Sequence, residues 1–349
     1  MIRFDNDYTT GAHKKILQRL IETNDIQTSG YGTDSFCEAA SELIREACNA
    51  PHADVHFLVG GTQTNKTVIA SMLRPHQAVI AAQTGHIATN ETGAIEATGH
   101  KVITLPSEDG KVQATAVDQL MNKHFEMGGN VHQVQPAMVY ISHPTEIGTL
   151  YTKDELIALQ QVCLKYDIPL FLEGARLGYG LVAPETDVTL PIIADNCDIF
   201  YIGGTKVGAM FGEAVVIMNP QYKKDFRYMM KQGGALLAKG RLLGIQFETL
   251  FTDNLYTDIS KHAVDLALAI REAFLLKGFK SFIDSKTNQQ FFVLPNYVLA
   301  ELSKKYIFTI WQQYNETHTV IRICTSWATS KEDVTALISD VLSMKVTAN

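Results

Sequence analysis

The feature that most constrains this chain is a regular alternation of short apolar runs with longer helical patterns from about residue 55 onward. The runs are rich in β-branched residues: VHFLVG, AVIAAQ, KVITLP, AMVYIS, IPLFLEG, IFYIGG and AVVIMN. Strands that alternate with helices are typical of crossover units in a mostly parallel sheet. Several runs are apolar throughout, as in strands buried on both faces. The sequence therefore predicts an α/β fold whose mostly parallel sheet of about seven strands is sandwiched by helices.

The segments on either side of this alternation have different patterns. Residues 13–49 predict one or two amphipathic helices split by the turn-rich QTSGYGTDS, and a long helical stretch follows the last strand run. Antiparallel strands are then predicted at FFVLPN, FTIWQQY and TVIRICTSW, with a closing helix at SKEDVTALISDVLSMK. We expect an N-terminal segment plus large cofactor-binding domain over residues 1–238, and a small C-terminal α/β domain over residues 239–349.

Charge and composition exclude several kinds of partner. The formal net charge is -7 and the basic residues are spread along the chain, so no surface for nucleic acid or an anionic membrane is expected. No apolar stretch approaches the roughly 20 residues that cross a bilayer, and no signal-peptide pattern is present. The five cysteines are scattered without a CxxC motif, which predicts reduced, buried thiols and no metal site. We expect a cytoplasmic protein.

The segment GGTQTN, residues 60–65, lies between a strand run and a helical pattern. A glycine pair at such a turn lets the backbone approach a phosphate, and the N–H groups and dipole of the helix start bind the anion. Gly61 would give the close approach and Thr62 a hydroxyl donor. A simple tight turn capped by Thr62 is the alternative. The segment matches neither GxGxxG nor GxxxxGK[ST], which disfavours a dinucleotide fold or a P-loop.

Two further candidate residues follow strand runs. IPLFLEG ends on Glu173, and the carboxyl end of a parallel strand faces the crevice where α/β proteins bind ligands. A carboxylate that only caps a turn or pairs with Arg176 is the alternative. Lys206 lies in a Gly-rich turn between two apolar runs, where desolvation favours the neutral amine that forms imines. A surface lysine is the alternative for that position.

The order of these three sites along the chain predicts the cofactor. A phosphate turn, a strand-end carboxylate and a lysine about thirty residues later together suit pyridoxal 5'-phosphate in an aspartate-aminotransferase-like fold. The turn would anchor the phosphate, Glu173 would meet the ring nitrogen, and Lys206 would hold the aldehyde as a Schiff base. The sequence therefore predicts an enzyme that breaks a bond at the α-carbon of an amino acid.

These segments resemble the threonine aldolase family, in the β-eliminating lyase group of fold type I pyridoxal-phosphate enzymes. GGTQTN is similar to the family's SGT-x-x-N, GHIATNETGA to its H-I-x-x-x-E-x-G-A, and FLEGARL to its DGAR motif. The resemblance spans nearly the whole chain. It implies that His86 stacks on the cofactor ring, with Glu91 following, and that Arg176 lies near the cofactor and the substrate carboxylate.

Other segments resemble the family less closely. SGYGTDS is similar to VYGEDPT, which implies that Tyr31 reaches the active site of a partner subunit. NVHQVQPAMVYISHPTEIG resembles the stretch with a second histidine, here His132, although a solvent-facing loop histidine is the alternative. VIRICTSW resembles a strand with a carboxylate-binding arginine, here Arg322. The resemblance also implies substrate binding by Asn6, where the family usually has Ser, and a cross-subunit phosphate ligand at Lys231.

The resemblance implies cleavage of a β-hydroxy-α-amino acid, threonine or allo-threonine, to glycine and an aldehyde, in a homodimer or homotetramer with shared active sites. Arg176 and Arg322 would clamp the α-carboxylate, and His86 or His132 would remove the β-hydroxyl proton. Another pyridoxal-phosphate amino-acid lyase, such as a β-eliminating lyase, is one alternative. A catalytically impaired paralogue that still binds the cofactor is the other.

Position 173 departs from the family, which has Asp where this chain has Glu173. One extra methylene displaces the carboxylate relative to the ring nitrogen. From sequence we expect weakened but real catalysis, and we expect a change of Glu173 to Asp to raise turnover.

Overall fold

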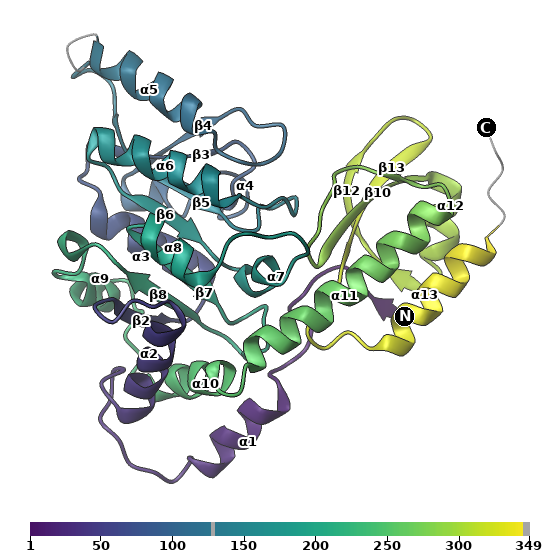
Figure 1. The fold of residues 1–349 in the computed structure, drawn as a ribbon, viewed down its shortest axis with the longest axis horizontal. Coiled ribbons are helices and arrows are strands. Elements are labelled where there is room, and N and C mark those ends of the chain that lie inside the picture. The colour runs from purple at the N-terminus through teal and green to yellow at the C-terminus, as the bar shows by residue number, and fades with distance from the viewer. Residues whose placement is uncertain (127–129, 345–349) are drawn as a thin grey trace.

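The computed structural model describes residues 1–126 and 130–344, and its central element is a seven-stranded sheet (Figure 1). The strand order is β2-β8-β7-β6-β5-β3-β4, and β8 is antiparallel to both of its neighbours while the other pairs are parallel. The strands are β2 (Asp54–Leu58), β3 (Gln77–Ala82), β4 (Lys101–Leu105), β5 (Gln135–Ser142), β6 (Leu170–Glu173), β7 (Ile199–Gly203) and β8 (Glu213–Ile217). The seven predicted runs form these strands, so the predicted sheet is confirmed.

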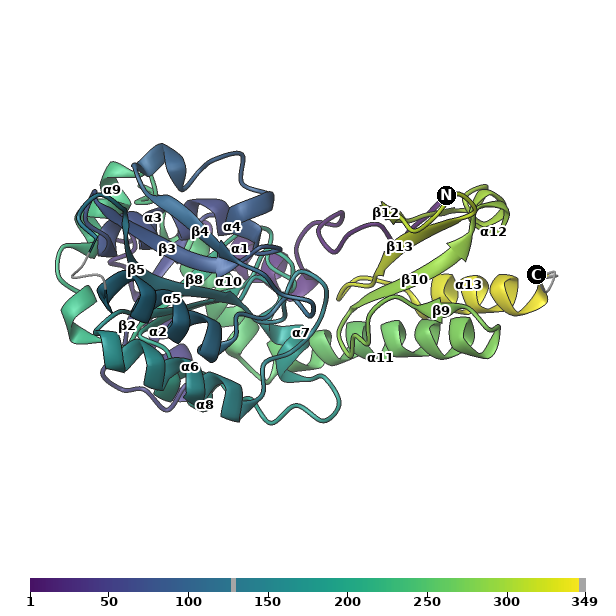
Figure 2. The same cartoon turned by 90° about the horizontal axis from the view of Figure 1, so that it is seen from above.

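Helices cover both faces of this sheet (Figure 2). One face carries α3 (Gly61–Met72), α4 (His86–Thr89) and α9 (Phe226–Gln232), and the other carries α5 (Ala114–Glu126), α6 (Lys153–Tyr166) and α8 (Leu190–Asn196). Thr152 and Glu155 form a reciprocal capping box that starts α6. The strands β5, β6 and β7 are buried along nearly their whole length, as their continuous apolar patterns predict.

The carboxyl ends of β5 and β6 lie side by side, because Ser142 is in register with Glu173. The strand β7 pairs with β6 in parallel, so the turn that contains Lys206 leaves the same edge of the sheet. The short helix α7 (Leu177–Leu181) begins just after β6, at the same edge. The fold therefore brings the strand-end residues singled out from the sequence to one edge.

The N-terminal segment and the C-terminal part also have their predicted elements. The helices α1 (Lys14–Glu22) and α2 (Ser35–Ala47) flank the turn-rich segment, and α10 (Arg241–Phe251) packs against α2. A four-stranded antiparallel sheet has the order β12-β13-β10-β9. Its neighbourhood comprises α11 (Leu255–Leu276), β9 (Lys280–Ser281), β10 (Gln289–Pro295), α12 (Asn296–Leu302), β12 (Thr309–Gln313), β13 (His318–Cys324) and α13 (Lys331–Ser343). Lys345, the last residue of the predicted closing helix, lies outside the described residues.

The start of the chain crosses to this small C-terminal unit, which the sequence patterns did not indicate. The strand β1 (Ile2–Arg3) pairs in parallel with β11 (Tyr306–Ile307), and Phe4 is buried in the small hydrophobic core. The long helix α11 contributes to both cores, so it joins the two units. The domain boundary at residues 238 and 239 remains a proposal. Within the described residues, no helix has the length and apolar character needed to cross a membrane.

Candidate active site

Three titratable side chains meet at the edge of the sheet where β3 and β6 end. His86 begins α4 after β3, Glu91 follows α4, and Glu173 is the last residue of β6. One ligand atom from each lies within 4.8 Å of the others. His86 is partly exposed, whereas both carboxylates are buried. The arrangement can bind a polar ring or exchange a proton through His86, the one partly exposed member of the three.

Asn65, in the second turn of α3, holds the two carboxylates together. Its Nδ2 donates to Glu91 Oε1 at 2.7 Å and to Glu173 Oε2 at 2.9 Å. Tyr140 on β5 also donates its hydroxyl to Glu173 Oε2. Buried carboxylates need such donors, because an unpaired buried charge is costly. The structure therefore explains the Asn of GGTQTN: its amide donates hydrogen bonds to both carboxylates where they lie side by side.

His86 is oriented from both its side chain and its backbone. Its Nδ1 lies 2.8 Å from Glu91 Oε1, and its backbone N–H donates to Glu146 Oε1 at 2.9 Å. Ser142 donates its hydroxyl to the same Glu146 oxygen at 2.6 Å. Burial lowers the pKa of His86, but the hydrogen bond to Glu91 and the charge of Glu173 outweigh it and leave the pKa raised. With Nδ1 held by Glu91, Nε2 is the nitrogen that can exchange a proton with a ligand.

Lys206 lies in the turn between β7 and β8 and is partly buried. Its backbone carbonyl accepts a hydrogen bond from the Tyr179 hydroxyl at 2.5 Å. Burial, and then the charge of Arg176, lower the pKa of the Lys206 amine, although nearby carboxylates oppose the shift. This direction favours the neutral amine that reacts with an aldehyde.

Arg176 is already paired, which the sequence did not indicate. Its Nε donates to Asp7 Oδ2 at 2.7 Å and its Nη2 to Asp7 Oδ1 at 3.0 Å, and Asn288 donates to Oδ2 at 2.9 Å. Burial opposes ionisation of Asp7, but the charges of Arg176 and Lys206 lower its pKa to about 2. The fork of Arg176 is thus filled by Asp7, so Arg176 reaches a substrate carboxylate only with its remaining N–H groups. The only sequence signal for Asp7 was an acidic residue beside Asn6.

Arg322 approaches the same region from β13 of the small unit. Its Nη2 donates to the Asp5 carbonyl at 2.9 Å and its Nη1 to Gln289 Oε1 at 3.2 Å. Its Nε is buried and has no hydrogen-bond partner among the described residues. Asn6 lies beside Asp5 in the N-terminal arm, the segment between β1 and α1, and donates to the Asp5 carboxylate at 3.1 Å. Asn6 therefore lies between two residues that bind the arginines: Asp5, whose carbonyl binds Arg322, and Asp7, whose carboxylate binds Arg176.

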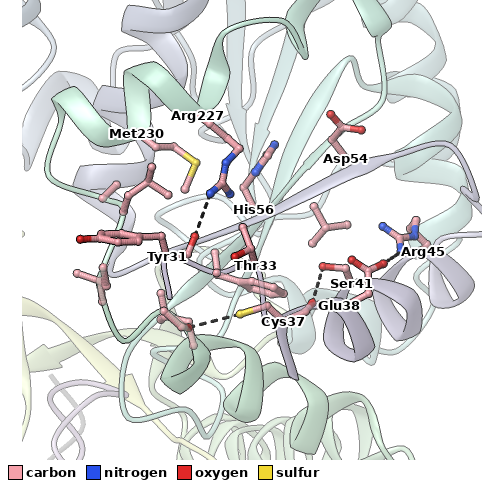
Figure 3. A pocket seen from close by; sticks show the side chains of 18 residues that line it. Tyr31, Thr33, Cys37, Glu38, Ser41, Arg45, Asp54, His56, Arg227 and Met230 are labelled. Carbon is pink, nitrogen blue, oxygen red and sulfur yellow. Dashed lines mark hydrogen bonds and ion pairs between the residues drawn. The ribbon is translucent and has the colours of Figure 1, made fainter. Parts of the chain in front are cut away.

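Tyr31 and Lys231 lie together but in a different place. Tyr31 is 46% exposed, and Lys231 Nζ is 4.7 Å from the centre of its ring. Arg227 donates to the Tyr31 carbonyl at 3.0 Å, beside a pocket of about 350 Å³ between α2, β2 and α9 (Figure 3). The residues that line this pocket include neither His86 nor Lys206. Within one chain, Tyr31 and Lys231 are not brought to the strand-end site.

His132 also lies away from the strand-end site. It is exposed and lies three residues before β5, which begins at Gln135. Its backbone N–H donates to Asn130 Oδ1 at 3.2 Å. An eight-residue strand spans about 25 Å, so His132 is near the opposite end of β5 from Ser142. His143, in the same sequence segment, lies instead at the carboxyl end of β5. It is fully buried, and burial lowers its pKa to about 4.

The helix α3 begins in a way that suits a phosphate. Its N-cap, Gly60, has no side-chain capping bond, and a side-chain carbon at Gly61 would lie 3.2 Å from the Tyr201 hydroxyl. That hydroxyl is buried and has no hydrogen-bond partner among the described residues. Thr62 is exposed in the first turn. A helix start without a side-chain cap, with the exposed Thr62 and a Tyr201 hydroxyl that has no partner among the described residues, fits the phosphate of pyridoxal phosphate. Glu173 and Lys206 fit its ring nitrogen and aldehyde.

The helix-sandwiched sheet, with a phosphate turn, a strand-end carboxylate and a lysine turn at one edge, defines the class of fold type I pyridoxal-phosphate enzymes. The chain belongs to the beta-eliminating lyase family, whose model matches residues 4–289. The lyase class and the cofactor predicted from the sequence are thereby confirmed.

Individual relatives agree with this assignment. A threonine aldolase of Leishmania major is 43% identical, with a TM-score of 0.95 over 98% of each chain. A low specificity L-threonine aldolase of Pseudomonas aeruginosa is 27% identical, over 97% of this chain and 96% of the relative. An aspartate aminotransferase of Thermus thermophilus, 12% identical with a TM-score of 0.72 over 98% of this chain and 91% of its own, supports the fold alone. The predicted resemblance to threonine aldolases and the predicted fold class are confirmed.

Proposed function

We propose that this protein is a pyridoxal-phosphate-dependent threonine aldolase, which cleaves a β-hydroxy-α-amino acid to glycine and an aldehyde. The observation that carries the proposal is the bonded group of Asn65, His86, Glu91 and Glu173 at the sheet edge from which the Lys206 turn leaves. The likeness to the Leishmania major threonine aldolase over nearly the whole chain supports the substrate class.

The residues that hold the cofactor are assigned from their places in the fold. The start of α3, with Gly61 and Thr62, would bind the phosphate, and Lys206 would bind the aldehyde carbon. Glu173 would meet the ring nitrogen, and His86 would stack on the ring. When bound, pyridoxal phosphate supplies the electron sink for the pair released as the Cα–Cβ bond breaks.

The chain's own groups hold the substrate and move its protons. Arg322 and the remaining N–H groups of Arg176 bind the α-carboxylate by charge-assisted hydrogen bonds. His86 Nε2 accepts the β-hydroxyl proton, so that the Cα–Cβ bond breaks, the aldehyde leaves, and the α-carbon takes up a proton to give glycine. His86 is preferred to His132 as the base because His132 lies at the far end of β5. His86 must be neutral to accept this proton, and its pKa is raised. We therefore expect kcat/KM to fall as the pH decreases through the pKa of His86, and this fall should begin above the ordinary pKa of imidazole.

Borohydride reduction and product analysis test this proposal. After reduction of the loaded enzyme, peptide mapping should place the pyridoxyl group on Lys206 and leave Lys231 unlabelled. Threonine should give glycine and acetaldehyde in equal amounts. Formation of pyruvate and ammonia from a β-substituted amino acid, without glycine from threonine, would support the alternative of a β-eliminating lyase. Cofactor binding without turnover would support the impaired paralogue, and a label on another lysine would overturn the site assignment.

The assembly is part of the same proposal. We propose at least a homodimer, with a homotetramer as the alternative, in which Tyr31 and Lys231 of one chain reach the cofactor of its partner. Their exposure and mutual contact, away from their own chain's site, support this. A fully active monomer in sedimentation at assay concentration would refute it. We also propose a cytoplasmic location, which the five free, buried cysteines support.

A further inference from the structure

Glu213 is a buried carboxyl group that the mechanism above does not use. It is the first residue of β8, directly after the lysine turn, and only 3% of it is exposed. Its Oε1 lies 2.8 Å from Thr205 Oγ1, and its Oε2 accepts from the Gly204 N–H at 3.3 Å. These two residues immediately precede Lys206, so the hydrogen bonds of the carboxyl group hold the first part of the lysine turn in place.

The Thr205 hydroxyl is placed to bond with either protonation state of this carboxyl group. Thr205 Oγ1 accepts from the Gly212 N–H at 3.0 Å and lies 3.4 Å from the Gly212 carbonyl. When Glu213 is ionised, the hydroxyl donates to its Oε1. When Glu213 is protonated, its own hydrogen can reach Thr205 Oγ1, and the Thr205 hydrogen can turn to the Gly212 carbonyl. The turn therefore keeps its contacts in both states, and the difference between them is the charge.

The surroundings of Glu213 disfavour that charge. The groups that face it are Lys206 in the turn, Glu173 on β6, Tyr201 on β7 and Tyr256 on α11. Burial, with the charge of Glu173, raises the pKa of Glu213 to about 8, although Lys206 and the hydrogen bonds from Thr205 and Gly204 oppose the rise.

Glu213 also lies close to the phosphate turn. It is in register with Leu58 at the end of β2 on one side and with Gly203 at the end of β7 on the other. The chain passes from Leu58 into Gly60 and Gly61, where the phosphate binds in the proposed function. A negative charge at this position would repel the phosphate and would stabilise the charged, unreactive form of the lysine amine.

We propose that Glu213 is a positioning residue for Lys206, which in its neutral form fixes the lysine turn and permits cofactor binding, and whose ionisation weakens that binding. This inference rests on the proposed function, because it takes Lys206 to be the residue that attacks the cofactor aldehyde. In that condensation the Lys206 amine forms a C=N bond and one water leaves, so the amine must be uncharged.

The test is the affinity of the apoenzyme for pyridoxal phosphate, measured by absorbance between pH 6.5 and 9.5. In the parent, affinity should fall by up to about tenfold per pH unit above the Glu213 titration. Glu213→Gln copies the neutral acid, because its amide donates to Thr205 Oγ1 and accepts from the Gly204 N–H. It should bind as the parent does at pH 7 and lose this component of the pH dependence. Glu213→Ala, which removes both contacts as well as the charge, should bind the cofactor more weakly than Glu213→Gln at every pH.

An identical pH dependence in the parent and in Glu213→Gln would overturn the proposal, since titration of Lys206 and of the cofactor is common to both. Should Glu213→Ala fail to fold, Thr205→Val removes the hydroxyl's contacts with Glu213 and Gly212 but keeps the contact of Glu213 with the Gly204 N–H, and unchanged affinity in that variant would refute the anchoring role. Borohydride labelling of Lys206 in the parent distinguishes a failure of the proposed function from a failure of this inference. Absence of the label defeats the proposed function, whereas a labelled Lys206 with no effect of Glu213 defeats only this inference.

Discussion

The two ends of the proposed site are built in different ways. At the cofactor end, Asn65 comes from α3, Glu91 from the loop after α4 and Glu173 from the end of β6, and each lies in a short recognisable motif. Their donors and acceptors match one another without help from the small unit. Asn65, Glu91 and Glu173 of this compact network each lie in a motif singled out in the sequence, whereas Tyr140, which donates to Glu173, is not among the candidate residues.

The carboxylate end is assembled from segments that are distant in the chain. Arg176 pairs with Asp7, 169 positions away, and Arg322 bonds to the backbone of Asp5, 317 positions away. The N-terminal arm joins the two by crossing to the small unit. A sequence motif therefore identifies a charge but not its partner, and a residue assigned to the substrate can already be paired within the protein.

The strongest test of this contrast is Asp7→Ala. Arg176 would remain buried without its bidentate partner, which typically costs about 3 to 5 kcal/mol of stability. The folded-state pKa of Asp7 is lowered to about 2, so its contribution is present above the usual Asp pKa and is lost as pH falls through about 2. Urea unfolding should therefore show a large difference between variant and parent at pH 7 that shrinks at strongly acidic pH.

The control for Asp7 is Asp5→Ala, which breaks the more exposed pair with Arg3. It should barely change stability, because exposed ion pairs contribute little. If both variants unfold at the same urea concentration as the parent, the Asp7 pair is not part of the framework of the site.

Asn65→Leu tests the cofactor end. The substitution keeps the approximate volume but removes both donors between Glu91 and Glu173, so we expect a loss of about 2 to 3 kcal/mol and weaker cofactor binding. Asn122→Leu removes a bond to Asp118 and one from the Tyr166 hydroxyl, away from the site. It should have little effect on either measurement, because Tyr166 keeps Asp118 as a partner. A change of stability with no change of cofactor absorbance would show that the network supports the fold and not the site.

Arg322→Leu tests substrate binding at the carboxylate end of the site, and its readout is KM and not stability. It should raise KM for threonine by about 10 to 100-fold, because a charge-assisted contact to the substrate is lost, while cofactor content stays near normal. Arg271→Leu, in the same small unit but paired with the exposed Asp284, should leave KM unchanged. An unaltered KM in Arg322→Leu would remove Arg322 from the site.

The sequence predicted the elements of this fold well, because alternating strand and helix patterns are local. The turn at GGTQTN, the strand-end Glu173 and the turn at Lys206 also lie where the local patterns put them, whereas their binding roles remain proposals. It missed Asp7 and Asn288, whose roles depend on contacts across 169 and 281 positions. It also missed Glu213, because a single carboxyl group at the start of an apolar strand run has no local pattern that separates a buried role from a solvent-facing one.

The smallest expected effect concerns Glu173, where the structure reverses the direction expected from sequence. The family's Asp suggested that Glu173→Asp would raise turnover. Here Glu173 Oε2 accepts from both Asn65 and Tyr140, and these donors are placed for the longer side chain. Shortening it by one methylene withdraws the carboxylate by about 1.5 Å, the length of one C–C bond, which would break or stretch both bonds.

We therefore expect Glu173→Asp to lower kcat severalfold, with cofactor still bound through the phosphate turn and Lys206. Glu173→Gln should lower kcat further, because it keeps the length but removes the charge that faces the ring nitrogen. Tyr140→Phe, which removes one donor and leaves the carboxylate in reach of Asn65, should fall between the parent and Glu173→Asp. Single-turnover measurements with threonine give the ranking. A faster Glu173→Asp would mean that the Asn65 and Tyr140 contacts hold the carboxylate away from its working position.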